Sequence, residues 1–284
     1  MVAIGLAALI ATQTPPVGLH GHIAVRIGDS VLVAGGITYA GRHNSAWTYS
    51  IKADSWRGAS SPSDPRSFAV GIGHIGRALV MGGIAADGSH SDRIDVYDVV
   101  RDQWSNLGKL PEKMSRAAGT VWNGKAYLSG GYNGIDDHRA ANSAKLWEYD
   151  LGKKKWRSLQ SMSVARHGHC LVAFKGRLWA IGGYGSTDLH GSVESYDVGR
   201  NTWRKEPSLP SNRGFFGAGV VSGVLVVFGA IDGTTQPVAL VDGKWKPLNS
   251  NDISMRRFAY VQSGDKFLVF GGEPNGAPVQ RFSL

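Results

Sequence analysis

Residues 162–203 read MSVARHGHCLVAFKGRLWAIGGYGSTDLHGSVESYDVGRNTW, and the pattern of this stretch decides the fold. After Arg166, one apolar segment runs to the turn 175–177, and a second ends at the glycine pair Gly182-Gly183. A third segment covers 192–197, and a tight turn leads to a last one at Trp203. The spacing leaves no room for helices, so we expect four short strands joined by turns.

The same unit recurs along the whole 284-residue chain. Glycine pairs end apolar runs about 42 to 52 residues apart, at Gly35-Gly36, Gly82-Gly83, Gly130-Gly131, Gly182-Gly183 and Gly271-Gly272, with Gly229-Ala230 as a degenerate member. A tryptophan closes five units, at Trp56, Trp104, Trp156, Trp203 and Trp245, and an arginine opens five, at Arg66, Arg116, Arg166, Arg213 and Arg257, where the first unit has Leu19. This period predicts an all-β, six-bladed β-propeller with four antiparallel strands per blade.

The glycine pair, the Tyr-Asp about a dozen residues later and the tryptophan after it resemble the kelch repeat. The resemblance covers essentially the whole chain and implies a kelch-type propeller. It leaves function open, because kelch propellers include substrate adaptors, cytoskeletal binders and a few enzymes.

Composition limits the remaining possibilities. The six units use up the chain, so we expect a single domain, residues 1–284. Cys170 is the only cysteine, which excludes an intrachain disulfide and a cysteine-rich metal site. The net charge of +9 favours acidic partners, but no long basic run points to nucleic acid. We therefore expect a monomer without a cofactor or transmembrane segment that binds a protein or an acidic peptide.

The last repeat unit lacks its fourth strand, and the other end of the chain could supply it. The last unit has its arginine, its glycine pair and a third strand at 279–282, but no closing tryptophan. The apolar run within residues 1–14 has the right position to supply the fourth strand and close the ring. The alternative is a signal-peptide remnant, although no basic residues precede the run and it is too short to span a membrane. The compartment stays open between the cytoplasm and export.

The propeller topology assigns the candidate residues to two faces. With strands a to d counted outward in an antiparallel meander, the short a–b turns and the c–d turns share one face. The longer and more variable b–c loops and the d–a connections share the other. Binding residues concentrate where loops vary, so we expect function on the b–c/d–a face.

The five arginines at the d–a connections have two interpretations. The kelch resemblance implies pairing with an acid in strand c, which is present as Asp95 and Glu194, whereas other units have Trp47, Trp147 or Gln280 there. Alternatively, arginines without this partner face the channel mouth and bind a carboxylate or phosphate.

Further candidates lie on the same face. Tyr132 and Tyr184 directly follow a glycine pair, and Tyr39 lies three residues after one; all three could anchor a partner. The loop 132–146 is longer than its equivalents and carries His138 and Arg139, as either a solvated loop or a partner-contact loop. Eight of the nine histidines should lie on this face, with only His74 near the opposite turns. Because equivalent positions on neighbouring blades do not converge, we expect no metal site.

Two functions from different classes remain. The first is a protein-interaction module that binds an acidic partner over the channel mouth. The alternative is an enzyme acting on an acidic sugar, because the bacterial sialic-acid mutarotases (N-acetylneuraminate epimerases) are similar six-bladed propellers. Such a reaction needs an acid/base pair and an arginine for the carboxylate, for which Glu273 and Arg281 are the weak candidates.

Overall fold

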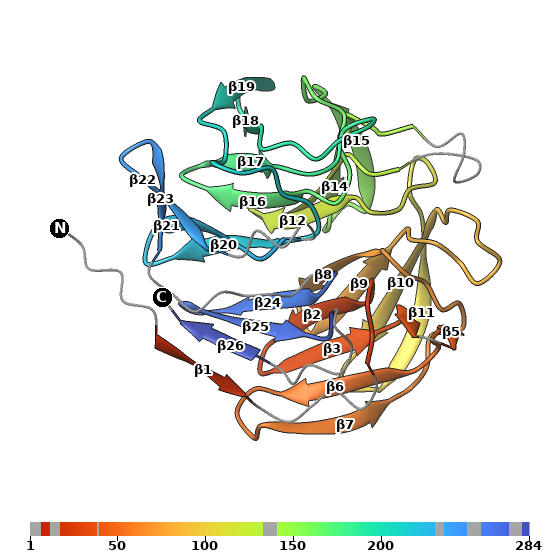
Figure 1. The fold of residues 1–284 in the computed structure, drawn as a ribbon. Coiled ribbons are helices and arrows are strands. Elements are labelled where there is room, and N and C mark those ends of the chain that lie inside the picture. The colour runs from red at the N-terminus through yellow and green to blue at the C-terminus, as the bar shows by residue number, and fades with distance from the viewer. Residues whose placement is uncertain are drawn as a thin grey trace.

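The computed structural model describes residues 7–11, 18–38, 40–132, 141–230, 236–248, 257–272 and 280–283. For residues 7–11 and 280–283 only the backbone is described; for the other ranges the side chains are described as well. All regular structure within these residues is β-strand, joined by tight turns (Figure 1). The predicted all-β class is therefore confirmed.

The described strands form six four-stranded antiparallel sheets, which we call blades 1 to 6. Blade 1 contains β2 (Ile23–Ile27), β3 (Ser30–Ala34), β6 (Ala46–Ser50) and β7 (Ser55–Ala59); blade 2 contains β8 (Val70–His74), β9 (Arg77–Met81), β10 (Arg93–Asp98) and β11 (Gln103–Lys109). Blade 3 contains β12 (Ala118–Trp122), β13 (Lys125–Ser129), β14 (Leu146–Asp150) and β15 (Lys155–Leu159); blade 4 contains β16 (Cys170–Phe174), β17 (Arg177–Ile181), β18 (Val193–Asp197) and β19 (Thr202–Glu206). Blade 5 contains β20 (Gly217–Val221), β21 (Val224–Phe228), β22 (Val238–Val241) and β23 (Lys244–Pro247); blade 6 contains β24 (Ala259–Ser263), β25 (Lys266–Phe270), β26 (Gln280–Ser283) and β1 (Ala7–Ala11).

The innermost strands form a closed circle. Strands β2, β8, β12, β16, β20 and β24 contact one another in this order, and β24 also contacts β2. This arrangement is a propeller with its blades around a central channel, as predicted from the repeats (Figure 1). The sequence analysis did not foresee one small addition, the two-stranded sheet of β4 (Ile37–Thr38) and β5 (Gly41–Arg42) in the b–c loop of blade 1.

Hydrophobic pattern explains which strands lie inside. The second strand of each blade is an almost unbroken apolar run, such as Val31-Leu32-Val33, because both faces of that strand contact neighbouring blades. The outermost strands carry exposed polar residues instead, as in β19. Apolar clusters between adjacent blades, such as the one joining Val25 and Leu32 to Val80 in blade 2, form the core.

The tyrosine and tryptophan of the repeat pack against each other across strands c and d. Tyr97 pairs in register with Trp104, and their ring centroids lie 5.2 Å apart. Equivalent pairs occur in blades 1, 3 and 4, at centroid distances of 5.1, 4.6 and 5.1 Å. Cross-strand aromatic pairs stabilise a sheet, which explains why the repeat keeps both residues.

Blade 6 takes its outer strand from the other end of the chain. Strand β1 pairs antiparallel with β26, with Ala11 opposite Gln280, so the sheet order is β1-β26-β25-β24. Figure 1 shows the two strands side by side near the C-terminus. This is the position that the sequence analysis assigns to the N-terminal run.

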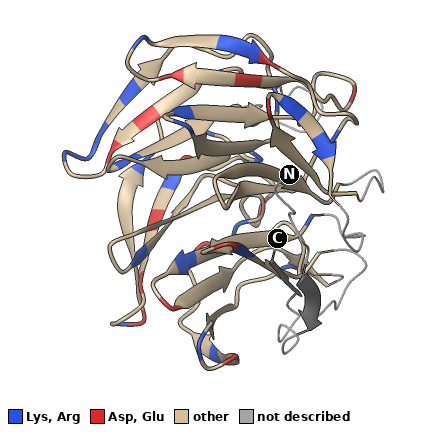
Figure 2. Ribbon diagram, turned by 90° about the vertical axis from the view of Figure 1, so that its left-hand side faces the viewer, with Lys and Arg blue, Asp and Glu red and all other residues tan. Residues whose placement is uncertain are grey.

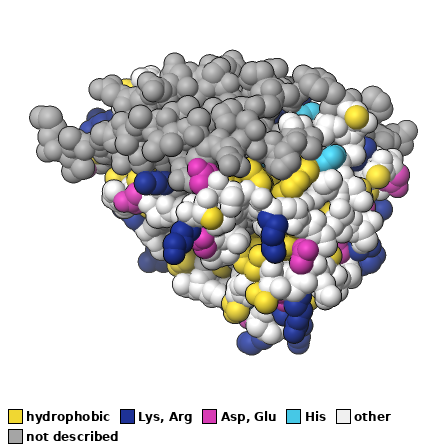
Figure 3. Space-filling view, turned by 90° about the horizontal axis from the view of Figure 1, so that it is seen from below, with side chains coloured by type: hydrophobic (Ala, Val, Ile, Leu, Met, Phe, Trp, Pro, Cys, Tyr) yellow, Lys and Arg dark blue, Asp and Glu magenta, His cyan; other side chains and the backbone are white. Residues whose placement is uncertain are grey.

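Charged residues of both signs are mixed in the two views of Figures 2 and 3. Figure 2 shows Lys and Arg positions in several blades with Asp and Glu positions among them, and the space-filling view in Figure 3 shows the same mixture on another face. In these two views the positive charges do not gather in one broad basic patch. The described chain has no helix with the length and apolar character needed to cross a membrane.

Candidate functional site at the channel mouth

A ring of six residues, one from each blade, surrounds one mouth of the channel. In chain order it consists of Gly21, Phe68, Arg116, Gly168, Phe215 and Arg257, which we call the mouth ring. Backbone N–H groups link neighbours around it: Phe68 donates to Gly21 at 2.6 Å, Arg116 to Phe68 at 2.9 Å, Gly168 to Arg116 at 2.9 Å, Phe215 to Gly168 at 2.8 Å and Gly21 to Arg257 at 3.3 Å. These bonds fix the six residues relative to one another, since buried backbone groups need such partners.

The mouth ring stores backbone strain. All six residues have left-handed φ angles between 50° and 62°, although four of them are not glycine. A side chain in this conformation costs roughly 1 kcal/mol or more. Residues held in such conformations cluster at functional sites, so the four side chains are candidates for a role in binding.

The mouth ring repeats the order Gly-Phe-Arg twice. Arg116 therefore lies three positions from Arg257 around the ring, and Phe68 three positions from Phe215. The two phenylalanine rings meet with centroids 5.9 Å apart. Glycine is needed beside them, because a Cβ on Gly21 would lie 2.8 Å from the Phe68 ring.

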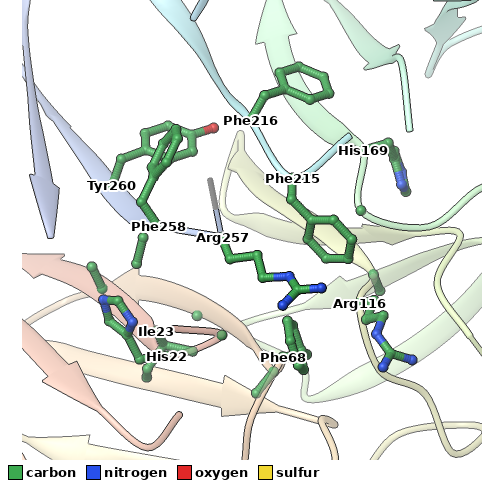
Figure 4. Close-up of a pocket in the computed structure, with 17 residues that line it drawn as sticks. His22, Ile23, Phe68, Arg116, His169, Phe215, Phe216, Arg257, Phe258 and Tyr260 are labelled. Atoms are coloured by element: carbon green, nitrogen blue, oxygen red, sulfur yellow. The ribbon is translucent and has the colours of Figure 1, made fainter. Parts of the chain in front are cut away.

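Below the mouth ring lies a pocket of about 210 Å³. The residues that follow the ring positions contribute to its wall, including His22, His169, Phe216 and Phe258 (Figure 4). Figure 4 shows Arg257 extending toward Phe68 and Phe215.

The pocket is positively charged. The described lining residues include two arginines, Arg116 and Arg257, and no Asp or Glu. Burial lowers the pKa of His22 to about 4 and that of His169 well below its usual value, so both imidazoles are neutral at pH 7. The charge of the lining at neutral pH thus comes from the two guanidinium groups.

Aromatic side chains hold Arg116 and form one wall beside the mouth. The Arg116 guanidinium carbon lies 5.0 Å from the Phe68 ring centroid and 5.3 Å from that of Tyr132, which is a cation–π arrangement. His167 stacks on Tyr184 at 5.1 Å and meets Tyr132 edge-on at 4.7 Å. Tyr132 and Tyr184 are therefore half-buried members of an aromatic cluster rather than exposed platforms.

Three of the predicted arginines are structural. Arg166 is fully buried, pairs with Glu194 at 2.7 Å and donates to the carbonyls of Gly182 and Ser192 at 2.8 and 3.0 Å. Arg66 is buried against Asp95 in the same way. These two pairs confirm the structural interpretation, in which the acid of strand c neutralises the arginine.

Arg213 is also buried but has no acid at the equivalent position. It donates to the carbonyls of Gln236 at 2.6 Å and Gly229 at 3.3 Å. The guanidinium groups of Arg66, Arg166 and Arg213 thus bind inside their own blades and do not take the channel-mouth position that the second interpretation gives to arginines without an acidic partner.

Arg116 and Arg257 belong to a different position of the repeat. The carbonyl of Arg166 accepts a hydrogen bond from the second glycine of a pair, and in the preceding blade the carbonyl of Met114 takes this role for Gly83. Met114 is thus the equivalent of Arg166, and Arg116 lies two residues further on. The sequence carried a signal for this difference: Arg66, Arg166 and Arg213 each precede a glycine by 16 residues, whereas Arg116 and Arg257 lie two residues closer to theirs.

The histidines of the b–c loops pack locally. His43 stacks on Trp47 at 5.4 Å, and His190 shares a hydrogen bond with Ser192 at 2.9 Å. No group of three or more His, Cys, Asp or Glu side chains within the described ranges could hold a metal ion. Burial raises the pKa of the Cys170 thiol to about 12, so it stays protonated.

The remaining predicted residues are not placed. Tyr39, His138, Arg139 and Glu273 lie outside the described residues, and of Arg281 only the backbone in β26 is described. The site that the structure presents is therefore made of Arg116 and Arg257 from the predicted set, together with Phe68 and Phe215. The sequence analysis missed the two phenylalanines because they align with an arginine and a glycine in other blades.

Comparison with known proteins identifies the family. Residues 7–236 match the family model described as the Attractin/LZTR1 beta-propeller, so the chain belongs to that β-propeller family. The human Kelch-like protein 34 is 26% identical over 230 residues, covering 76% of this chain and 35% of that protein. Alpha-scruin from Limulus polyphemus is 31% identical over 153 residues, covering 51% of this chain and 16% of that protein. These matches confirm the kelch-repeat resemblance.

The chain spans about a third of the length of the Kelch-like proteins that it matches. Among solved structures, the structure of YjhT is similar with a TM-score of 0.78 at 20% sequence identity, covering 94% of both chains. At this identity the likeness supports the fold alone.

Proposed function

We propose that this chain is a six-bladed kelch-repeat interaction module that binds an acidic protein segment at the mouth of its channel, on the b–c/d–a face. One observation carries the proposal: Arg116 and Arg257 occupy opposite positions of the strained mouth ring above a pocket whose described lining has no acidic residue. The similarity to Kelch-like proteins supports an interaction propeller.

The chemistry of the pocket favours a carboxylate or phosphate. A guanidinium group binds either anion through two parallel hydrogen bonds, and it does so more strongly where apolar neighbours exclude water. Phe68 and Phe215 provide this apolar surrounding between the two arginines. An acidic side chain from a partner would lie against the contacting Phe68 and Phe215 rings and approach the two positive charges.

The test replaces both arginines by glycine. Gly21 and Gly168 occupy the same ring position in blades 1 and 4, so the Arg116→Gly/Arg257→Gly variant should keep the backbone and its melting temperature to within about 3 °C. The probe is a fluorescein-labelled peptide with four consecutive glutamates, titrated by fluorescence anisotropy at 50 and 200 mM salt. We expect the variant to lose at least about tenfold in affinity, since charge-assisted hydrogen bonds contribute about 1.5–3 kcal/mol.

The matched control removes two positive charges elsewhere. Lys153 and Arg200 are exposed in c–d turns on the opposite face, and Lys153→Gly/Arg200→Gly has the same net charge as the test variant. Wild-type affinity in this control is the expected result. An equal loss in both variants, or no loss in the mouth variant, would reject the proposed site.

The alternative function is an enzyme that acts on an acidic sugar at the same pocket. It would use the arginines for the sugar carboxylate, but the described lining offers no carboxylate for acid–base catalysis. Exchange NMR of N-acetylneuraminate with and without the protein separates the two. Faster anomer exchange that disappears in Arg116→Gly/Arg257→Gly would replace the interaction module by the enzyme.

A further inference from the structure

A second cavity opens on the opposite face of the propeller, between blades 2 and 3. It has a volume of about 560 Å³ and lies between the a–b and c–d turns of blade 2 and the c–d turn of blade 3. We call it the blade 2–3 groove. Its apolar lining includes Leu79, Val96 and Tyr149, which belong to the core between the two blades. These three residues are buried, whereas Leu107 and Leu151, which pack on the same core, are only partly buried and line the groove.

Two aliphatic side chains stand on its rim. Ile75 is 84% exposed and Val100 is 89% exposed, and they are the large hydrophobic residues of the described chain that stand out to solvent. Single exposed aliphatic residues are ordinary. Ile75 and Val100 both line the same groove, and exposed apolar residues gathered at one site are typical of a surface that binds a partner.

The conformation of Ile75 is costly for its own turn. Ile75 has φ 42°, in a two-residue turn that connects β8 to β9. A β-branched residue is a rare outlier in this region. The other five blades have Gly28, Asn123, Lys175, Ser222 and Gly264 at the same position of the turn. Neither the turn nor the core requires an isoleucine there, because its side chain is in solvent.

The c–d turn of blade 3 adds positive charge to the groove. In blades 1, 2 and 4 the tyrosine that recurs in strand c donates its hydroxyl to an acceptor five residues later, as Tyr97 does to Asp102 at 2.7 Å and Tyr196 to Asn201 at 2.6 Å. In blade 3 the residue five positions after Tyr149 is Lys154, whose ammonium group cannot accept a hydrogen bond from the Tyr149 hydroxyl. Both Tyr149 and Lys154 line the groove.

The other charged residues of the groove are mostly basic. Arg77 and Arg101 lie 3.4 and 3.7 Å from the carboxylate of Asp98, which is the acidic residue of the described lining. With Lys154, the described lining contains three cations and one carboxylate. The groove thus combines an apolar floor with a rim of net positive charge.

We propose that the blade 2–3 groove is a second interaction surface, and that its occupant is an extended segment of another protein that carries aliphatic side chains next to Asp or Glu. The aliphatic side chains contact the floor between Ile75 and Val100. The carboxylates lie near Lys154, Arg77 and Arg101, and one of them accepts a hydrogen bond from the Tyr149 hydroxyl. This surface is separate from the channel mouth and does not depend on the function proposed there.

The test uses a random 12-residue peptide library displayed on phage and selected on the full chain, after depletion on the Ile75→Asn/Val100→Gly variant. Asparagine accepts the left-handed conformation, and glycines occur in the c–d turns of blades 3 and 4. The variant should therefore be as stable as the wild type or slightly more stable. Selected peptides should combine aliphatic and acidic residues and bind the variant at least about tenfold more weakly, as expected for losing a buried aliphatic contact.

Two controls make the result specific. Lys175→Asn changes the equivalent turn residue of blade 4 and should leave peptide affinity unchanged. Arg116→Gly/Arg257→Gly should do the same, which separates this surface from the mouth.

The proposal is overturned if depletion leaves no enriched peptides, if the enriched peptides are not acidic, or if either control loses the same affinity. Sedimentation velocity adds a further check. A wild-type dimer that Ile75→Asn/Val100→Gly converts to a monomer would make a second copy of this chain the occupant and would overturn the peptide assignment.

Discussion

A shift of two residues decides what an arginine does in this chain. Arg166 lies at the position whose carbonyl binds the glycine pair, and its side chain turns inward to Glu194. Arg116 lies two residues further along its repeat, in the left-handed conformation of the mouth ring, with its guanidinium over Phe68. The first arrangement stabilises a blade, and the second presents charge at the channel.

The buried pair gives a prediction for stability. Arg166→Met introduces the residue that blade 3 has naturally as Met114, but it leaves Glu194 buried without its cation. Breaking a buried ion pair from one side costs about 3–5 kcal/mol, so urea unfolding should show a loss of this size. Adding Glu194→Gln should recover part of the loss, because it removes the unpaired charge. A cost below about 1 kcal/mol for Arg166→Met would contradict the structural role.

At the level of strands and turns, each glycine pair makes room for the neighbouring blade. A Cβ on Gly130 would lie 2.3 Å from the carbonyl oxygen of Arg166, whereas a Cβ on Gly176, in a hairpin turn, would have no atom within 4 Å. Both glycines have left-handed φ angles, 61° and 71°. A comparison of Gly130 with Gly176 therefore separates the energetic cost of the left-handed conformation from that of the contact with the next blade.

We expect Gly176→Ala to lower the free energy of unfolding by about 1 kcal/mol, the cost of placing a side chain in this region. Gly130→Ala should cost at least about 3 kcal/mol, because the backbone of the next blade must also move. Urea denaturation of both variants measures the difference. Similar losses in the two variants would mean that the glycine pairs serve only conformation and not the contact between blades.

The same elements show what sequence can predict here. The glycine pairs, the Tyr–Trp pairs and the apolar second strands recur in the repeats, so their spacing predicts the propeller. The pairing of Arg66 with Asp95 is implied by the kelch resemblance. The mouth ring arises from contacts between blades. In the sequence, an arginine of the ring such as Arg116 is hard to distinguish from a structural arginine such as Arg166, which lies only two residues earlier in its repeat. The blade 2–3 groove depends on Lys154 and Ile75 at positions where a repeat alignment shows only ordinary turns.

For the molecule as a whole, closure gives the two faces their separate characters. The d–a connections bring six residues into one hydrogen-bonded ring, so the mouth combines contributions from every blade. On the opposite face the described residues show a local link between turns, from Ser222 in blade 5 to Asp265 in blade 6. The groove on that face is formed by two neighbouring blades. Strand β1 covers the edge of β26 in blade 6, which would otherwise be an open sheet edge. One face thus offers a central site, and the other a peripheral one.

Acid should destabilise the whole propeller through its buried histidines. Burial lowers the pKa of His22 to about 4 and that of His169 well below its usual value, whereas both should titrate near 6.5 in the unfolded chain. The unfolded state therefore takes up protons first, and stability falls as the pH drops from about 6.5 toward 4, by about 1.4 kcal/mol per pH unit for each such histidine. His22 directly follows a mouth-ring residue, and the same position in the next two repeats is alanine, at Ala69 and Ala117. His22→Ala should therefore be tolerated and should flatten the curve of unfolding free energy against pH. Val25→Ala lowers stability without removing a titrating group and should shift the curve while keeping its slope; equal slopes in wild type and His22→Ala would show that His22 is not the acid-sensitive residue.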